Sequence, residues 1–506
     1  MADTTTDAGT CTYRGLATAG APDLSGLRGV AREVVEAQGE LEIERYDTDD
    51  RRLAGAGVVL AVHRAGDGEH WELDLPDAPG AEQIRVAGTA AGDRPPAELD
   101  ELVRGVRRNR PLRPIGRVRT IRRPTQLRAE DGRLLARIVH DEVTAATFGS
   151  STDVTAWTEV RLEPGAAGAR LRAAVAQRIA EAGLEPAPPA AVTELDRLLD
   201  TWPRRTRRAG PRGSAGAVLM AYVMGQVDRI ATEELRVRRD QPDAVHQLRV
   251  AARRLRSALQ AYRPLLRTEV TGPIGEDLRW LGRALAPARN AEVLRERIAA
   301  GLAELPPQLR LGPVQAQVQR HFARAEAEAR AAALTELDGE RYDALRRALD
   351  DLVEHPPLTA RAARPARREL PRSARRSARR LERAVIAATS ADVAAEERDE
   401  AMHAARKAGK RLRYATEVAR PAVGKPAKRF AKNLKGLQSA LGEHQDTVVA
   451  AGALRELGAA AHVAGENGFS FGVLLGRDTA RARGIEAELP ALWAAAWRRK
   501  RRAWLR

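Results

Sequence analysis

A short basic segment occurs twice in this chain, and this internal repeat constrains the fold more than any other feature. The segments VHQLRVAARRLR and MHAARKAGKRLR place His246 and His403 157 residues apart. Downstream, LGRALAPARNAEVL and LQSALGEHQDTVVA begin at Leu281 and Leu437, 156 residues apart. Two matches at almost the same offset predict a tandem helical unit, in which two halves pack with pseudo-two-fold symmetry.

Each copy spaces its basic residues along one face of a helix. Offsets of zero, three, seven and ten span roughly 80° at about 100° per residue. The residues at these offsets are His246, Arg249, Arg253 and Arg256 in the first copy and His403, Arg406, Lys410 and Arg413 in the second; Arg254, Lys407 and Arg411 are further cations in the same segments. Two such faces repel each other unless an anion lies between them, so the repeat predicts a binding site for phosphate.

Other basic residues of the helical region recur at three- and four-residue spacing. A solvated face is the commonest explanation of a single stripe of this kind. The residues that we predict to extend the anion site are Arg375, Arg376, Arg379, Lys432 and Lys435. Matching the two repeats aligns Arg289 and Asn290 with Gln445 and Asp446, and Arg289 joins the predicted site. His444 also joins it, although a histidine at the edge of the core explains that residue equally well.

The charge of the chain is divided unequally. Residues 1–200 carry 26 Arg and 33 acidic residues, a net charge of −7, whereas residues 201–506 carry 59 Lys and Arg and 35 acidic residues, a net charge of +24. The second part is therefore expected to attract a polyanion. Its basic stripes contain almost no interleaved aromatic residues, which disfavours nucleic acid as the primary ligand and favours a polymer without bases, such as inorganic polyphosphate.

The chain has one cysteine, Cys11, so no disulfide can form within it. The first ten residues lack the basic and apolar regions of a signal peptide, and no apolar run approaches the ~18–20 residues that a membrane span requires. These features predict a cytoplasmic protein without a membrane partner. The sequence shows no Ser/His/Asp set, phosphate-binding loop or zinc-ligand spacing, so we predict no catalytic residue, metal ligand or cofactor.

The N-terminal region shows the alternating pattern of β-strands. The strands are predicted over Thr10–Arg14, a segment centred on Leu41, Ile43 and Arg45, and Val58–Arg64, Trp71–Leu75, Ile115–Thr120, Leu134–Val139, Glu142–Thr147 and Ala156–Leu162. Leu99–Arg107, Ala167–Glu181 and Val192–Trp202 have helical periodicity. The pattern predicts an antiparallel β-barrel with a few helices over residues 1–202.

The strand signal ends in a stretch rich in proline and arginine. Pro203–Gly213 is predicted to be a linker, and residues 214–506 form an all-α bundle of two tandem repeats, interrupted at Pro356–Pro371. The expected fold class is therefore α+β with two domains.

The basic segments resemble those of a known family. VHQLRVAARRLRSALQAY, MHAARKAGKRLRYATEVA and LQSALGEHQDTVVA are similar to the diagnostic segments of the CHAD domain, the conserved histidine α-helical domain. The resemblance runs from about Ser214 to the C-terminus. It implies a pseudo-symmetric helical bundle that binds polyphosphate through a basic surface, often at polyphosphate granules, with both basic segments contributing.

The N-terminal region resembles the CYTH family, a triphosphate tunnel barrel that often precedes a CHAD domain. The likeness lies in YDTDDRRLAGAGVVL, WELDLP and GRLLARIVHDEVTA. The resemblance implies carboxylates for Mg²⁺ or Mn²⁺ and lysines for the triphosphate, but Thr10 and Thr12 stand where the carboxylates belong, Asp74 replaces the expected lysine, and no lysine precedes Lys407. We therefore predict that the barrel has lost triphosphatase activity.

Several carboxylates and arginines of this region could in principle bind a metal ion or an anion. Glu40, Glu42 and Glu44 alternate as on a solvated strand face, and we prefer that interpretation to a substitute metal site. Glu159 and Glu163 are weak cation ligands because Arg161 lies between them. The cations expected to hold an anion weakly are Arg117, Arg119, Arg122 and Arg123.

Three functions remain open at this point. The first is polyphosphate binding by the helical domain. The second is a triphosphatase or polyphosphatase that uses Mg²⁺ or Mn²⁺ in the barrel, with the helical domain as a substrate tether. The third is a nucleic-acid-binding or scaffold protein.

Overall fold

The computed structural model describes residues 10–66, 68–75, 82–88, 94–108, 110–149, 152–187, 191–200, 210–390 and 394–505. The chain divides into two compact units, Met1–Thr206 and Arg207–Arg506. The division falls inside the predicted linker Pro203–Gly213, of which residues 203–209 lie outside the described parts of the chain. Trp202, the predicted end of the preceding helix, also lies outside them.

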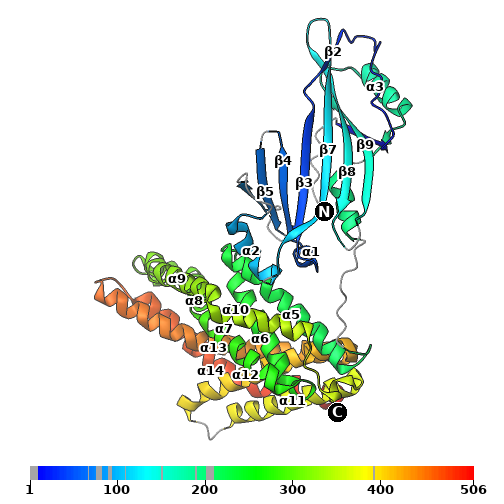
Figure 1. Cartoon of the computed structure of the whole chain (residues 1–506). Helices are drawn as coiled ribbons and strands as arrows, with labels where there is room; N and C mark the ends of the chain where they lie inside the picture. The colour runs from blue at the N-terminus through cyan, green and yellow to red at the C-terminus, as the bar shows by residue number, and fades with distance from the viewer. Residues whose placement is uncertain are drawn as a thin grey trace. The chain divides into compact units, whose positions relative to one another are not determined.

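The first unit is built on one large sheet with short helices around it (Figure 1). Its strands are β1 Cys11–Leu16, β2 Arg32–Val35, β3 Gly39–Asp47, β4 Val59–Ala65, β5 Gly68–Leu75, β6 Glu82–Ala87, β7 Arg113–Arg128, β8 Leu134–Thr147, β9 Val154–Pro164 and β10 Glu185–Pro186. Its helices are α1 Arg52–Gly55, α2 Ala97–Arg107, α3 Ala169–Glu181 and α4 Ala191–Asp200.

All strand pairings of this sheet are antiparallel. The order is β10-β1-β9-β8-β7-β3-β4-β5-β6, and β2 pairs with β7 beside that path. Within the described residues no pairing joins β10 to β6, so the sheet is open where we expected a closed barrel. The predicted α+β class with two domains is confirmed.

Most predicted strands occur, with two differences. The predicted strands Leu134–Val139 and Glu142–Thr147 are one continuous strand, β8. His140 and Asp141, which separate the two predicted strands, are both buried, and Asp141 accepts hydrogen bonds from Arg122 of β7 at 2.9 Å. The predicted strands do not include β2, β6 or the two-residue β10, whose described residues are half-exposed or exposed and therefore alternate weakly.

Two of the helices cover apolar parts of the sheet. On α4, Leu195 and Leu199 pack with Ile115, Val118 and Val143 of β7 and β8. Val175 and Ile179 of α3 belong to a second cluster that includes residues of β1, β7, β8 and β9. Full burial of a leucine or isoleucine side chain stabilises a fold by about 1.5–3 kcal/mol, so these contacts hold the helices on the sheet.

The second unit is entirely helical within its described residues. Its α-helices are α5 Ala215–Arg238, α6 Ala244–Ala261, α7 Thr268–Ala284, α8 Ala286–Glu304, α9 Val314–Asp338, α10 Glu340–Glu354, α11 Ala366–Thr389, α12 Ala395–Val423, α13 Lys425–Val463 and α14 Phe469–Ala496. The 3₁₀ segments are η1 Arg263–Leu265, η2 Pro307–Leu309, η3 Ala360–Ala363 and η4 Arg499–Leu505. None of the helices in the described parts of the chain has the length and apolar character that crossing a membrane requires.

The two basic segments lie on equivalent helices, α6 and α12. Each follows a 24-residue helix, α5 or α11, and α13 and α14 lie side by side in the second half (Figure 1). The halves differ where the first copy has Pro287 and the second has Glu443. Proline has no N–H to donate, and the first copy is divided at Leu285 into α7 and α8, whereas α13 continues for 39 residues.

The helical unit has one large apolar core. Leu248 and Leu255 of α6 and Ala405 and Leu412 of α12 are completely buried in it. The hydroxyl of Tyr262, just after α6, donates a 2.6 Å hydrogen bond to the carbonyl of Ala415 in α12. The same core and this bond therefore join the two repeats.

The non-helical break predicted at Pro356–Pro371 ends earlier in the structure than the sequence suggested. The helix α11 begins at Ala366 and continues through Pro371. Proline removes one helical hydrogen bond, but Leu370, Ala374 and Leu381 bury an apolar stripe of α11 in the core, which outweighs that loss.

Candidate functional site

The structure brings the predicted cations of α6 and α12 together. We define the central cluster as His246, Arg249 and Arg253 of α6, Arg289 of α8, and His403, Arg406, Lys407 and Lys410 of α12. Arg249 and Arg253 lie close enough to Lys410 for their charges to act on its ammonium group. The charge of Arg289 acts on both His246 and Arg249. Three helices, α6 and α8 of the first repeat and α12 of the second, thus contribute to one basic surface.

Acidic groups are scarce around this surface. Arg289 lies 3.4 Å from Asp243 and 2.8 Å from Glu292, and Arg406 lies 3.4 Å from Asp446. No carboxylate oxygen of the described residues lies within 4.0 Å of the charged nitrogens of Arg249, Arg253 or Lys410. Arg253 instead donates a 3.1 Å hydrogen bond to the hydroxyl of Tyr414. The cluster therefore has a large excess of positive charge.

Burial makes this excess charge unfavourable in the free protein. It lowers the pKa of Lys410 to about 7, and the charges of Arg406 and Arg253 add to the effect. Burial is also the main cause of the lowered pKa of Arg249, followed by repulsion from Arg253 and Arg289. A polyanion bound at the cluster would replace this repulsion by attraction.

The two histidines of the cluster have the same type of environment. Burial and the neighbouring Arg289 lower the pKa of His246, so its ring is neutral at pH 7 in the free protein. Burial also lowers the pKa of His403, although a hydrogen bond between its Nδ1 and Gln445 of α13 acts in the opposite direction. A phosphate chain bound beside these rings would favour their charged form.

Some guanidinium groups at the cluster have an unused donor. Nε of Arg289 and Nε of Arg406 are buried without a hydrogen-bond partner among the described residues. A buried N–H group without a hydrogen-bond acceptor costs free energy. Both of these groups belong to members of the central cluster. An anion at this place would supply acceptors.

Four other predicted residues of the basic segments point elsewhere. Arg254 and Arg413 lie 3.5 and 3.0 Å from Glu417. Arg256 faces α7, where the charges of Arg279, Glu276 and Arg283 act on it, and Arg411 lies beside α11. The fourth position of each basic stripe, Arg256 or Arg413, thus leaves the face that the first three share.

His444 is part of the core edge and not of the central cluster. Its side chain is 2% exposed, and its Nε2 lies 3.1 Å from Glu486 and 3.6 Å from Asp399. Lys432 and Lys435 are exposed on α13.

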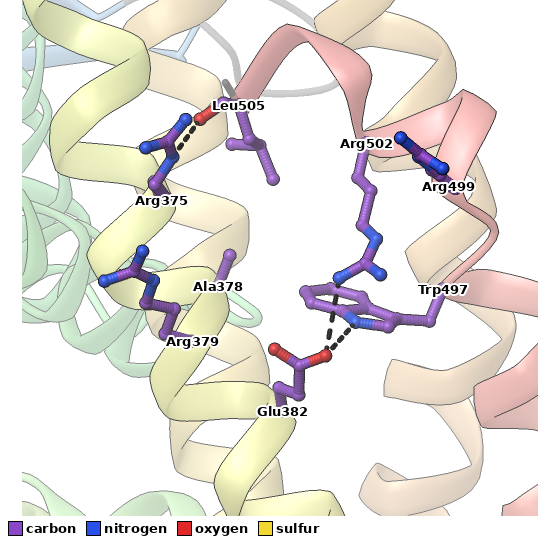
Figure 2. Close-up of a pocket in the computed structure, with 8 residues that line it drawn as sticks. All are labelled: Arg375, Ala378, Arg379, Glu382, Trp497, Arg499, Arg502 and Leu505. Carbon is purple, nitrogen blue, oxygen red and sulfur yellow. Dashed lines mark hydrogen bonds and ion pairs between the residues drawn. The ribbon is translucent and has the colours of Figure 1, made fainter.

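The arginines of α11 line two pockets. The first, of about 280 Å³, lies between α11 and the C-terminal segment and is drawn in Figure 2; it is lined by Arg375, Arg379, Glu382, Trp497, Arg499 and Arg502, with Ala378 and Leu505. Arg375 Nε donates to the Leu505 carbonyl at 2.6 Å, and Trp497 Nε1 donates to Glu382 at 2.8 Å. These bonds fix the C-terminal segment against α11.

The second pocket, of about 430 Å³, lies between α11 and the end of α6. Its cations are Arg263, Arg376, Arg379, Arg380, Arg383 and Arg411. Since Arg379 lines both pockets, they form one continuous basic surface along α11. Arg375, Arg376, Arg379 and Arg411 were predicted from the sequence, but Arg263, which lies just after α6, and Arg499 and Arg502 were not. The only signal for Arg499 and Arg502 is the density of arginine near the C-terminus.

The arginines of the N-terminal sheet are engaged with carboxylates. Arg117 binds Glu44 at 2.8 Å, Arg119 binds Glu40 at 2.5 Å, Arg122 binds Asp141 at 2.9 Å, and Arg123 binds Glu142. The arginines that we expected to hold an anion weakly are therefore already paired with carboxylates of the same sheet.

The acidic residues of this sheet also differ from the prediction. Glu44 is 3% exposed and accepts hydrogen bonds from Tyr46, Arg64 and Arg117, so the interpretation of a solvated face was wrong for it. Glu159 accepts a 2.8 Å hydrogen bond from Trp157.

Glu163 and Arg161 of the same strand also have partners of their own. Glu163 lies 3.1 Å from Arg137, and Arg161 lies 3.3 Å from Asp141. Each carboxylate therefore has its own partners within the sheet.

Comparison with known proteins gives similarities over both the whole chain and the helical unit. The chain is 32% identical over 495 residues to Uncharacterized protein MT2285 of Mycobacterium tuberculosis (strain CDC 1551 / Oshkosh), which covers 93% of this chain and 92% of the relative. It has the same identity and coverage with Uncharacterized protein Rv2226 of strain ATCC 25618 / H37Rv.

Among solved structures, PptA from Streptomyces chartreusis is similar with a TM-score of 0.47 and 24% identity, covering 56% of this chain and 99% of that one. The CHAD domain from the plant Ricinus communis has a TM-score of 0.42 and 23% identity, covering 57% and 95%. The model of the CHAD domain family matches residues 221–455, which contain both basic segments and the central cluster. Together with the relatives matched over nearly the whole chain, this match shows that the protein belongs to the family of CHAD-domain proteins.

Proposed function

We propose that this protein binds inorganic polyphosphate at the central cluster. The observation that carries the proposal is the meeting of the two repeated helices: Arg249 and Arg253 of α6 face Lys410 of α12 without a carboxylate partner among the described residues. A chain of phosphates places one negative charge on each repeating unit, so it can contact several of these cations at once.

The aromatic residues near the cluster support a ligand without bases. Tyr262 and Tyr414 are 0% and 4% exposed, and their hydroxyl groups are engaged within the bundle. Neither ring can stack on a nucleotide base, which proteins that bind single-stranded nucleic acid commonly require. Nucleic acid is therefore the weaker candidate for the primary ligand.

The basic surface along α11 offers a path for a longer ligand. Arg411 of α12 lines the same pocket as Arg376 and Arg379, and α11 packs against α12. A long polyphosphate could contact the central cluster and this surface together, and association with polyphosphate granules in the cytoplasm would follow from such multivalent binding.

The test is retention of the full-length protein on immobilised long-chain polyphosphate. The Arg253→Glu/Lys410→Glu double variant should lose retention at a salt concentration at which the parent is held. Arg320→Glu/Arg324→Glu is a matched control, because it makes the same change of charge at two exposed arginines of α9. Equal retention of the parent and the Arg253/Lys410 variant would refute the proposal.

The ligand class is tested by competition. Polyphosphate, DNA and RNA are added at matched phosphate concentration and matched salt, because electrostatic affinity falls steeply as salt rises. Displacement by polyphosphate at the lowest concentration supports the proposal, whereas displacement by DNA or RNA at a lower one favours nucleic-acid binding.

A further inference from the structure

A cluster of metal-ligating side chains lies in the N-terminal sheet, in the other unit of the chain. His63 of β4 and His70 of β5 are directly opposite each other in the strand register, and Glu72 lies two residues along β5 on the same face. The imidazole rings are stacked, with their centroids 4.9 Å apart and an interplanar angle of 14°. His63 Nε2 lies 3.7 Å from Glu72 Oε1, and one potential ligand atom from each residue lies within 4.8 Å of the others.

This arrangement suits a divalent metal ion. Each neutral imidazole offers one unprotonated nitrogen as a ligand, and Glu72 adds a carboxylate oxygen. In a tetrahedral zinc site with bonds of about 2.0–2.1 Å, the donor atoms are roughly 3.3 Å apart, so the pair His63–Glu72 is already near the required separation.

The neighbouring strand β6 holds the carboxylate in place. Gln83 Nε2 donates a 2.6 Å hydrogen bond to Glu72 Oε1, and Arg85 Nε donates a 3.0 Å bond to Glu72 Oε2. Donors of this kind orient a ligating carboxylate and raise the affinity of metal sites. Arg45, another cation whose charge acts on His63, is offset by Asp196 at 3.4 Å, a carboxylate outside the proposed ligand set.

We propose that His63, His70 and Glu72 bind one divalent transition-metal ion of the Zn²⁺ class. Two nitrogens and one oxygen form a ligand set that Zn²⁺, Co²⁺ and Ni²⁺ prefer, whereas Mg²⁺ prefers an all-oxygen octahedron. Three protein ligands leave a fourth position open to water or to an anion. His63 keeps 27% of its side chain exposed, which gives the ion a route from solvent.

The test uses the full-length protein after removal of metals by a chelator. Zn²⁺ binding is measured by calorimetry, and Co²⁺ binding by its visible absorption, which reports coordination number and ligand type. The variants are His70→Gln and Glu72→Gln. The matched control is His355→Gln, because His355 is an exposed histidine whose Nδ1 lies 2.9 Å from Asp351, a histidine–carboxylate pair outside the proposed site.

The expected result is the loss of one equivalent of bound Zn²⁺ in His70→Gln and in Glu72→Gln, with no loss in the control. Gln83→Ala, which removes only the supporting hydrogen bond, should weaken binding by about 10–100-fold. Circular dichroism establishes that each variant is folded.

A second group in the helical unit must be separated from this one. Asp399, His444 and Glu486 also place ligand atoms within 4.8 Å of one another. Zn²⁺ bound only there would give the same stoichiometry and affinity in His70→Gln, in Glu72→Gln and in the parent. That result, or a parent that shows no saturable Zn²⁺ or Co²⁺ binding, would overturn the proposal.

Discussion

The guanidinium of Arg253 is held by the hydroxyl of Tyr414, with Nε donating a hydrogen bond of 3.1 Å. Arg253 belongs to the first repeat and Tyr414 to the second, so this bond connects the two basic helices at the central cluster. Tyr414 is 4% exposed, and its ring is fixed in the core. The bond therefore positions a cation for a ligand without neutralising its charge.

Removal of this bond should weaken polyphosphate binding less than removal of the charge. Tyr414→Phe should reduce the affinity by about 2- to 10-fold, because one hydrogen bond contributes roughly 0.5–1.5 kcal/mol. Arg253→Gln should reduce it further. Isothermal titration at fixed salt measures both, and an unchanged affinity in Arg253→Gln would contradict the assignment of Arg253 to the site.

Neutralisation of Lys410 should stabilise the free protein while it weakens binding. Lys410→Met removes a half-buried charge that is repelled by Arg406 and Arg253. Each 1 kcal/mol by which the loss of this repulsion increases the free energy of unfolding should raise the Tm by about 2–4 °C in a domain of this size. Thermal melts without ligand test the expectation. The control Lys428→Met lies at an exposed position of α13 outside the predicted site and should change neither Tm nor affinity appreciably.

The affinity for polyphosphate should decrease as the pH rises above about 7. The pKa of Lys410 is about 7 in the free protein, mainly because of burial, and a bound polyanion favours the protonated form, so binding takes up a proton above that pH. The decrease approaches tenfold per pH unit as a limit. Calorimetry in buffers of different ionisation enthalpy measures the proton uptake, and Lys410→Arg should show less of it.

Stability should change with pH in the opposite direction. The pKa of Lys410 is lower in the folded protein than the 10.5 of an ordinary lysine, so the unfolded chain binds more protons between pH 7 and 10.5. The contribution of this group to the free energy of unfolding therefore increases with pH in that window. A denaturant titration of the parent and of Lys410→Arg at several pH values would reveal this difference, and parallel profiles would contradict it.

The hydrogen bond between the two repeats should matter for stability but not for binding. Tyr262→Phe leaves the buried carbonyl of Ala415 without its 2.6 Å partner. The free energy of unfolding should fall by about 1–3 kcal/mol, with little change in affinity for polyphosphate. Urea titration measures the first quantity, and an unchanged midpoint would show that the carbonyl finds another donor.

The N-terminal unit is expected not to hydrolyse tripolyphosphate. Arg117, Arg119 and Arg122 are each held by a carboxylate of the same sheet, so the triphosphate would have to displace three ion pairs. Phosphate release is assayed with the full-length protein in Mg²⁺ and in Mn²⁺. Release at a rate that depends on either metal would favour the alternative function, a triphosphatase tethered to its substrate.

The repeat made the helical unit predictable from the sequence. A fixed offset between two basic segments implied equivalent helices, and the pairing of α6 with α12 brings together His246, Arg249, Arg253, Arg406 and Lys410. Periodicity could not identify the residues that leave this face. Arg256 and Arg413 have the right angular position, but Arg256 meets α7 and Arg413 meets Glu417, contacts that depend on how the helices pack.

The sheet was predictable in its strands but less so in its charges. Alternation along β3 and β9 gave correct strands, since one face of each is apolar or packed. It could not show that Glu44 is buried, because the arginines that satisfy it come from β4 and β7. The opposition of His63 and His70 depends in the same way on the register of β4 and β5, which their sequences do not contain.

The two halves of the binding surface are not electrically equivalent. Where the first repeat has Arg289 and Asn290, the second has Gln445 and Asp446, a difference of two unit charges at matched places. Arg289 is offset by Asp243 and Glu292, whereas Asp446 pairs with Arg406, so the two sides arrange their charges differently. A linear polyphosphate is identical when its ends are exchanged, but this surface is not, so a bound chain would meet a different order of cations and carboxylates on each side of its midpoint.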